Sequence, residues 1–101
     1  MTVAYLVVES NITDPESFKR YMAAAPDIVK AFGGQYLVRG GRMAVLEGDW
    51  QPPRLTVLQY PDFETAQAMY DSPAYVKARA LRQGATACFN MVLVEGVAAP
   101  V

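Results

Sequence analysis

The chain of 101 residues contains no histidine and a single cysteine, Cys88. Histidine is the commonest general base, haem ligand and zinc ligand, so we predict neither a metal site nor a cofactor. A catalytic triad that needs histidine to activate Ser, Thr or Cys is excluded on the same ground. One cysteine cannot form an internal disulfide and fits a reducing, cytoplasmic location. We expect Cys88 to be an inert, buried thiol between apolar strand neighbours.

Concentrated positive charge and long apolar runs are also missing. Nine Lys and Arg residues against ten Asp and Glu residues give a net charge of −1, and the basic residues are scattered. Without a basic stripe, nucleic acid is not an expected partner. No apolar stretch approaches the ~18 residues that span a bilayer. The first residues show no basic leader, so we expect no signal peptide and no membrane partner.

What remains is a pattern of alternating strands and helices in one domain, residues 1–97, with a frayed tail at 98–101. Capping signals place helix starts at Thr13 or Asp14, at Asp62 and at Ser72. Pro26 is expected to kink or split the first helix. The predicted helices span 15–32, 63–70 and 73–82, and the predicted strands span 3–10, 35–39, 42–47, 54–60 and 87–95.

The Gly40-Gly41 pair between two of these strands is the usual two-residue signature of a hairpin turn. A bulge within one long strand is the alternative. In the hairpin, Arg39 and Arg42 would face each other, an unfavourable pairing of like charges. Two arrangements would relieve this repulsion. One is a structural salt bridge with a carboxylate such as Glu47 or Asp49, and the other is an anion bound by Arg39.

The first and last strands are apolar on both faces. Leu6 and Val8 oppose Tyr5 and Val7 in the first strand, and the last strand shows the same pattern. Helices can cover only one face of such a sheet, and soluble monomers rarely expose a large apolar patch. We therefore predict an isologous homodimer through the open sheet face.

The order strand, helix, strands, helix, strand is that of an α+β, ferredoxin-like (split βαβ) fold, an antiparallel sheet with helices on one face. Several blocks resemble the domain of unknown function 1330 (DUF1330) family, of the dimeric α+β barrel superfamily. They are Thr13 to Glu16, Tyr36 to Gly41, Leu46 to Trp50 with Pro52 and Arg54, Tyr70 to Pro73 with Tyr75, and Leu93 to Gly96. Met69 stands where that family is expected to carry an aromatic residue.

The resemblance implies a homodimer with back-to-back sheets and a cleft between each sheet and its helices, but no established reaction. Relatives in the superfamily include cofactor-free monooxygenases, isomerase-like enzymes and non-enzymatic modules. Enzymatic activity is therefore left undecided.

The candidate ligand-binding residues are Arg39, Asp49, Trp50 and Tyr75. Trp50 either packs as a lid on the core edge or forms an aromatic wall, with Asp49 as hydrogen-bond acceptor. Tyr75 is expected at a cleft mouth. Three functions follow in order. The first is binding of a small organic molecule in the sheet–helix cleft. The second is cofactor-independent monooxygenase or isomerase chemistry on an aromatic or lactone substrate. The third is a structural dimer without a ligand.

Overall fold

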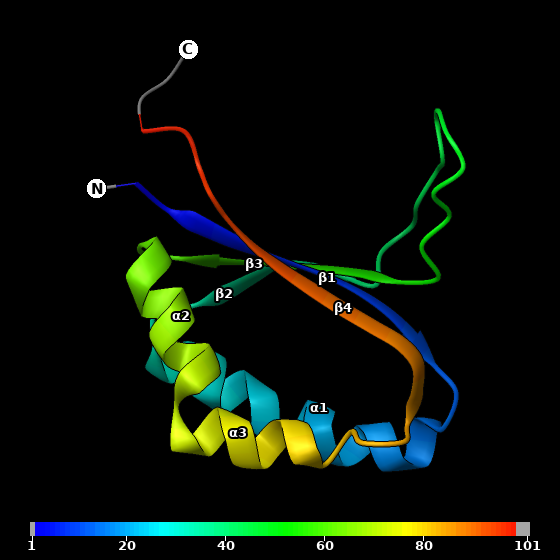
Figure 1. Ribbon diagram of the computed structural model, residues 1–101, viewed down its shortest axis with the longest axis horizontal. Helices are drawn as coiled ribbons and strands as arrows, with labels where there is room; N and C mark the ends of the chain where they lie inside the picture. The colour runs from blue at the N-terminus through cyan, green and yellow to red at the C-terminus, as the bar shows by residue number, and fades with distance from the viewer. Residues whose placement is uncertain (1, 99–101) are drawn as a thin grey trace.

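A four-stranded antiparallel sheet is covered on one face by three helices (Figure 1). The structure is a computed structural model and describes residues 2–98. The strands are β1 (Ala4–Ile12), β2 (Gln35–Arg39), β3 (Leu55–Tyr60) and β4 (Thr86–Glu95), and the helices are α1 (Pro15–Ala31), α2 (Phe63–Asp71) and α3 (Pro73–Ala80).

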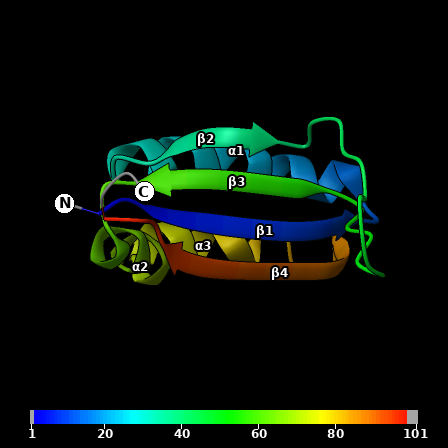
Figure 2. The ribbon, with the colours of Figure 1, turned by 90° about the horizontal axis from the view of Figure 1, so that it is seen from above.

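The strand order is β2-β3-β1-β4, seen directly in Figure 2, and every pairing is antiparallel. This order and the helical layer confirm the predicted α+β, ferredoxin-like fold. The predicted tail, residues 98–101, lies outside the described residues except for Ala98.

The helices begin where the capping residues predict. Asp14 accepts a hydrogen bond from the Ser17 backbone N–H at 3.2 Å, and Asp62 accepts one from Thr65 N–H at 2.7 Å. Such caps satisfy backbone donors that a helix start leaves unpaired. Ser72 does the same for α3. Of the kink or split predicted at Pro26, the split is wrong, because α1 continues through this residue as one helix.

The two sheet faces differ as the alternation predicts. Leu6 and Val8 on β1 are buried beneath the helices, together with Leu58 and Tyr60 of β3. The opposite face, called here the open face, carries Val92, which is 61% exposed, and other apolar side chains: Leu37, Val38 and Val94. The open face has no helix over it in Figures 1 and 2.

The predicted hairpin and the strand over 42–47 are wrong. Residues 40–54 form an irregular segment, called here the arm, which rises at one end of the sheet on the side away from the helices (Figure 1). A two-residue hairpin turn of the commonest type needs positive φ at both positions. Gly40 has φ +68°, but Gly41 is not in this region. Strand β2 pairs instead with β3, and Arg39 lies opposite Thr56 rather than Arg42.

No helix among residues 2–98 is both long and apolar enough to cross a membrane.

Candidate functional site

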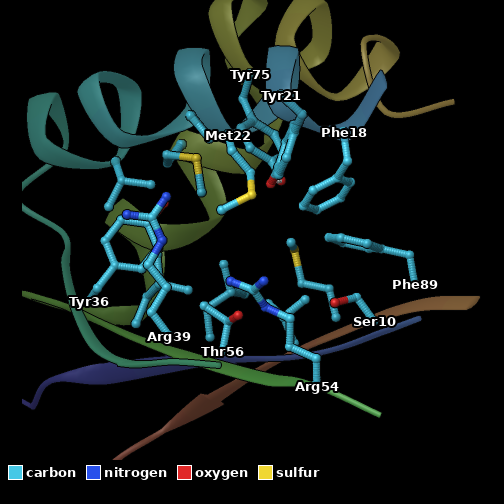
Figure 3. A pocket seen from close by; sticks show the side chains of 17 residues that line it. Ser10, Phe18, Tyr21, Met22, Tyr36, Arg39, Arg54, Thr56, Tyr75 and Phe89 are labelled. Carbon is cyan, nitrogen blue, oxygen red and sulfur yellow. Dashed lines mark hydrogen bonds between the residues drawn. The ribbon is translucent and has the colours of Figure 1, made fainter. Parts of the chain in front are cut away.

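A cleft lies between the helix-facing side of the sheet and helices α1 and α3 (Figure 3). The cleft has a cavity volume of about 50 Å³, and a wider volume of about 530 Å³ includes the open solvent at its mouth. Its walls are mainly apolar: Leu6, Val8, Phe18, Met22, Ala25, Val29, Leu58, Met69, Phe89 and Met91. The polar or amphipathic lining residues are Ser10, Tyr21, Tyr36, Arg39, Arg54, Thr56 and Tyr75.

Arg39 reaches this cleft because β2 contains a bulge. The pairing with β3 shifts between Tyr36 and Val38, so Leu37 is an extra residue. Side chains alternate along a regular strand, and Tyr36 and Arg39, three apart, would then lie on opposite faces. The bulge returns both to the helix-facing side, where the Arg39 guanidinium carbon lies 4.5 Å from the centre of the Tyr36 ring. This cation–π contact holds Arg39 at the edge of the cleft.

Arg54 lies at the other end of the arm and also faces the cleft (Figure 3). Its carbonyl accepts a hydrogen bond from the Ser10 backbone N–H at 3.1 Å. Its guanidinium packs against Gly40, where an added Cβ would lie 3.1 Å from the Arg54 Nε atom. Gly40 also donates its N–H to the Leu55 carbonyl at 2.9 Å, which closes the base of the arm. Glycine at position 40 therefore leaves room for the guanidinium.

Among residues 2–98, neither of these two cations has an anionic partner. Across residues 2–98, the only ion pair within 4.0 Å joins Lys19 to Glu16 on the exposed surface of α1. The cleft lining includes no Asp or Glu side chain. Arg39 is exposed and Arg54 is half-buried, so both guanidinium groups are partly accessible to water. The sheet side of the cleft is therefore electropositive, with apolar walls beyond it.

The helix side of the cleft carries a pair of tyrosine hydroxyls. Tyr21 of α1 and Tyr75 of α3 lie with their Oη atoms 2.6 Å apart, hydrogen-bonded to each other. Burial raises the pKa of the Tyr21 hydroxyl far above its usual range, and the Tyr75 hydroxyl adds to this rise, while the Arg82 guanidinium opposes it. Tyr21 is therefore protonated at neutral pH.

The four residues singled out from the sequence lie in two places. Arg39 and Tyr75 line the cleft, and Tyr75 is only 1% exposed. Asp49 and Trp50 lie on the arm, outside the cleft. The Trp50 indole donates to Glu9 Oε2 at 3.0 Å, and Glu9 also accepts from the Asn90 side chain at 3.0 Å. Glu9 stands on the open face, so this contact ties the arm to that side of the sheet.

Arg54 and Tyr21 are cleft residues that the sequence reasoning missed. Arg54 precedes the strand 55–60, and simple alternation places it on the same side as Thr56, Leu58 and Tyr60. This alternation is the sequence signal that points to Arg54 as a residue on the helix-facing side of the sheet. Tyr21 follows the apolar spacing of three and four residues along its helix, a pattern that predicts burial rather than a role in a cleft.

Within residues 2–98, no three or more Cys, Asp or Glu side chains come together in a group that could hold a metal ion.

The fold and the cleft define a small ferredoxin-like α+β protein with a narrow, mainly apolar cleft under its helices. Solved structures with this fold include a protein of unknown function from Rhodopseudomonas palustris, with a TM-score of 0.74 and 16% identity over 97% of this chain and 85% of that chain. Two dimeric ferredoxin-like proteins of unknown function also match. The one from Jannaschia has a TM-score of 0.63 and 13% identity over 91% of this chain and 97% of that chain. The one from Thermobifida fusca has a TM-score of 0.59 and 14% identity over 91% of this chain and 89% of that chain.

The sequence model of the family described as domain of unknown function DUF1330 matches residues 3–97. The chain belongs to this family. The comparison with curated proteins gives no significant match. The identities to the solved structures are low, so these structures show the fold alone.

Proposed function

We propose that the sheet–helix cleft binds a small organic anion, with its carboxylate against Arg39 and Arg54 and its apolar part between the sheet and the helices. The observation that carries this proposal is the convergence of two guanidinium groups, without an acidic partner, on an apolar cleft. Guanidinium groups match the planar carboxylate and form strong, charge-assisted hydrogen bonds with it.

This function is favoured over the two alternatives by where the residues lie. A structural dimer without a ligand would be expected to fill the space under its helices, whereas this chain leaves a cleft there. The enzymatic alternative places Arg39, Asp49, Trp50 and a Tyr or Asn90 around the substrate, whereas Asp49 and Trp50 lie on the arm.

The test compares hexanoate with its neutral analogue hexanamide by calorimetry and by thermal shift. Hexanoate should bind and hexanamide should bind at least tenfold more weakly, since a hydrogen bond to a charged group contributes about 1.5–3 kcal/mol. Arg39→Gln and Arg54→Gln should each weaken hexanoate binding about 10- to 100-fold. Arg42→Gln, on the exposed arm and away from the cleft, is the matched control. Equal binding of acid and amide, or equal effects of all three variants, would refute the anion site.

We also propose that a second copy of the chain covers the open face. Two of the solved structures with this fold are described as dimeric. Strands of this number and length span roughly 500 Å² at the usual spacings of 4.8 Å between strands and 3.3 Å per residue. Two such faces bury roughly 1,000 Å², the size at which specific interfaces begin, before the arm adds its share.

The arm supports the same pairing. Its apolar side chains Met43, Val45 and Leu46 are exposed, Leu46 by 89%. Because the arm rises on the side of the open face, a copy seated on that face would also meet these side chains (Figure 1).

The cytoplasmic location stays a prediction.

A further inference from the structure

The tyrosine pair gives the cleft a second polar end. Figure 3 shows the Tyr21 and Tyr75 hydroxyls on the helix side of the cleft, the Arg54 guanidinium nearer the sheet, and the Arg39 guanidinium between these levels beside the Tyr36 ring. The pair comes from two helices that are separate in sequence, α1 and α3. Phe18 and Phe89 line the space beside it.

The two tyrosine hydroxyls have one more proton to donate than their mutual hydrogen bond uses. Each tyrosine has one O–H, and the bond between Tyr21 and Tyr75 uses one of the two protons. No other hydrogen bond within residues 2–98 takes up the second hydroxyl proton. One O–H can therefore donate to a group in the cleft.

Arg82 makes this end of the cleft electropositive as well. Its guanidinium carbon lies 3.8 Å from the centre of the Phe89 ring and 5.1 Å from that of Tyr21. Its buried Nε–H has no hydrogen-bond partner in the described residues. A positive charge behind the hydroxyl pair favours an electron-rich ligand atom in front of it. It also disfavours a ligand cation or a second donor there.

We propose that the cleft selects organic anions that carry a second hydrogen-bond acceptor, such as a carbonyl oxygen, at the end remote from the carboxylate. This inference rests on the proposed anion-binding function and narrows the ligand to oxo-carboxylates and related acids with acceptors at both ends. The carboxylate lies against Arg39 and Arg54, and the remote oxygen accepts from the Tyr21–Tyr75 pair. A purely aliphatic acid satisfies only the first end.

The test uses oxo acids with their unsubstituted counterparts: 4-oxopentanoate, 5-oxohexanoate and 6-oxoheptanoate against pentanoate, hexanoate and heptanoate. At the chain length that spans the cleft, the oxo acid should bind the wild-type protein about three- to tenfold more tightly, the range of one neutral hydrogen bond. The other two lengths should show little preference, because their carbonyl cannot reach the hydroxyls.

The variants separate the hydroxyl pair from the space around it. Tyr21→Phe and Tyr75→Phe each leave one O–H free to donate, so each should keep part of the preference. The double variant has no hydroxyl left at this end of the cleft and should lose the preference for the oxo acid. Tyr70→Phe is the matched control, since Tyr70 packs on Tyr75 with ring centres 5.7 Å apart but does not line the cleft.

Two failures can be told apart. If no acid of either series binds, the proposed anion site itself is refuted. If the acids bind but no chain length shows a preference for the oxo acid, the two-ended selection is refuted and anion binding stands. The two-ended selection is also refuted if the Tyr21→Phe/Tyr75→Phe double variant keeps the full preference for the oxo acid. The wild-type comparison does not depend on the folding of any variant.

Discussion

Val92→Glu is the most direct perturbation of the proposed pairing between two copies. Val92 lies on β4 and pairs with Val7 of the central strand β1, on the open face. It is 61% exposed in the single chain, so the substitution removes little packing within one copy. In the proposed dimer the same side chain is covered.

The expected loss follows from the exposed fraction of this one side chain. Complete burial of a valine contributes about 1.5–3 kcal/mol, so covering the exposed part of Val92 contributes about 1–2 kcal/mol per copy. An isologous interface contains the residue twice, which doubles this to about 2–4 kcal/mol per dimer. Burying a carboxylate in its place adds a desolvation cost of several kcal/mol. The dissociation constant of the dimer should therefore rise at least about 30-fold.

Sedimentation velocity over a dilution series measures this change, and the fluorescence of Trp50 offers a second readout. Trp50 is the only tryptophan and is 59% exposed in the single chain. Its emission should shift to shorter wavelength as the wild type dimerises and should not shift in Val92→Glu.

Val76→Glu is the matched control. Val76 lies on α3, is 45% exposed, and belongs to the helical layer rather than to the open face. It should leave the dimer unchanged. A wild type that sediments as a monomer at micromolar concentration would refute the reasoning, as would a Val92→Glu variant that dimerises as tightly as Val76→Glu.

Three further perturbations test individual contacts. Gly40→Ala should weaken hexanoate binding, since the new Cβ lies 3.1 Å from Arg54 Nε and φ is +68°. Hydrogen bonds from Thr65 hold the pKa of the Asp62 carboxyl below its usual range. The ionised cap therefore stabilises the fold above the unfolded-state pKa, and this stabilisation is lost as the pH falls through the lower folded-state pKa. Asp62→Asn should flatten this acid dependence of the urea midpoint. Trp50→Phe removes the bond to Glu9, and should speed proteolysis within the arm while changing global stability by less than about 1 kcal/mol.

Each of these has its own control. Gly41→Ala adds a Cβ with nothing within 4 Å and at an ordinary φ, so hexanoate should bind it as it binds wild type. Equal losses at both glycines would show that the arm, not the Arg54 contact, matters. An acid dependence that Asp62→Asn leaves intact would assign it to other carboxylates. If arm proteolysis is unchanged in Trp50→Phe, the contact with Glu9 does not hold the arm.

The parts of the fold that were predictable depend on local chemistry. Asp14, Asp62 and Ser72 begin helices because a short polar side chain can accept from N–H groups two or three residues ahead. The strand faces follow from a period of two residues, which needs no knowledge of the partner strand. Those two signals, taken in order along the chain, were enough for the α+β fold.

The parts that were not predictable depend on pairing between distant segments. The bulge at Leu37 exists only in the register of β2 against β3, and it decides on which face Arg39 lies. The same pairing leaves residues 42–47 without a neighbouring strand, although their apolar alternation suggested one. The Tyr21–Tyr75 bond joins residues 54 positions apart, and neither shows it in its local pattern.

The arm connects the cleft and the open face, and this limits how each can be tested. Arg39 immediately precedes the arm and Arg54 ends it, and the Gly40 N–H to Leu55 carbonyl bond at 2.9 Å holds both ends together. A deletion within the arm would remove apolar surface from the open face and free the two guanidinium groups at once. Loss of anion binding after such a deletion would therefore say nothing about which of the two was responsible. Val92→Glu changes the open face without touching the cleft, and Arg54→Gln changes the cleft without altering the sheet. Only point variants of this kind can assign an effect to one side of the sheet.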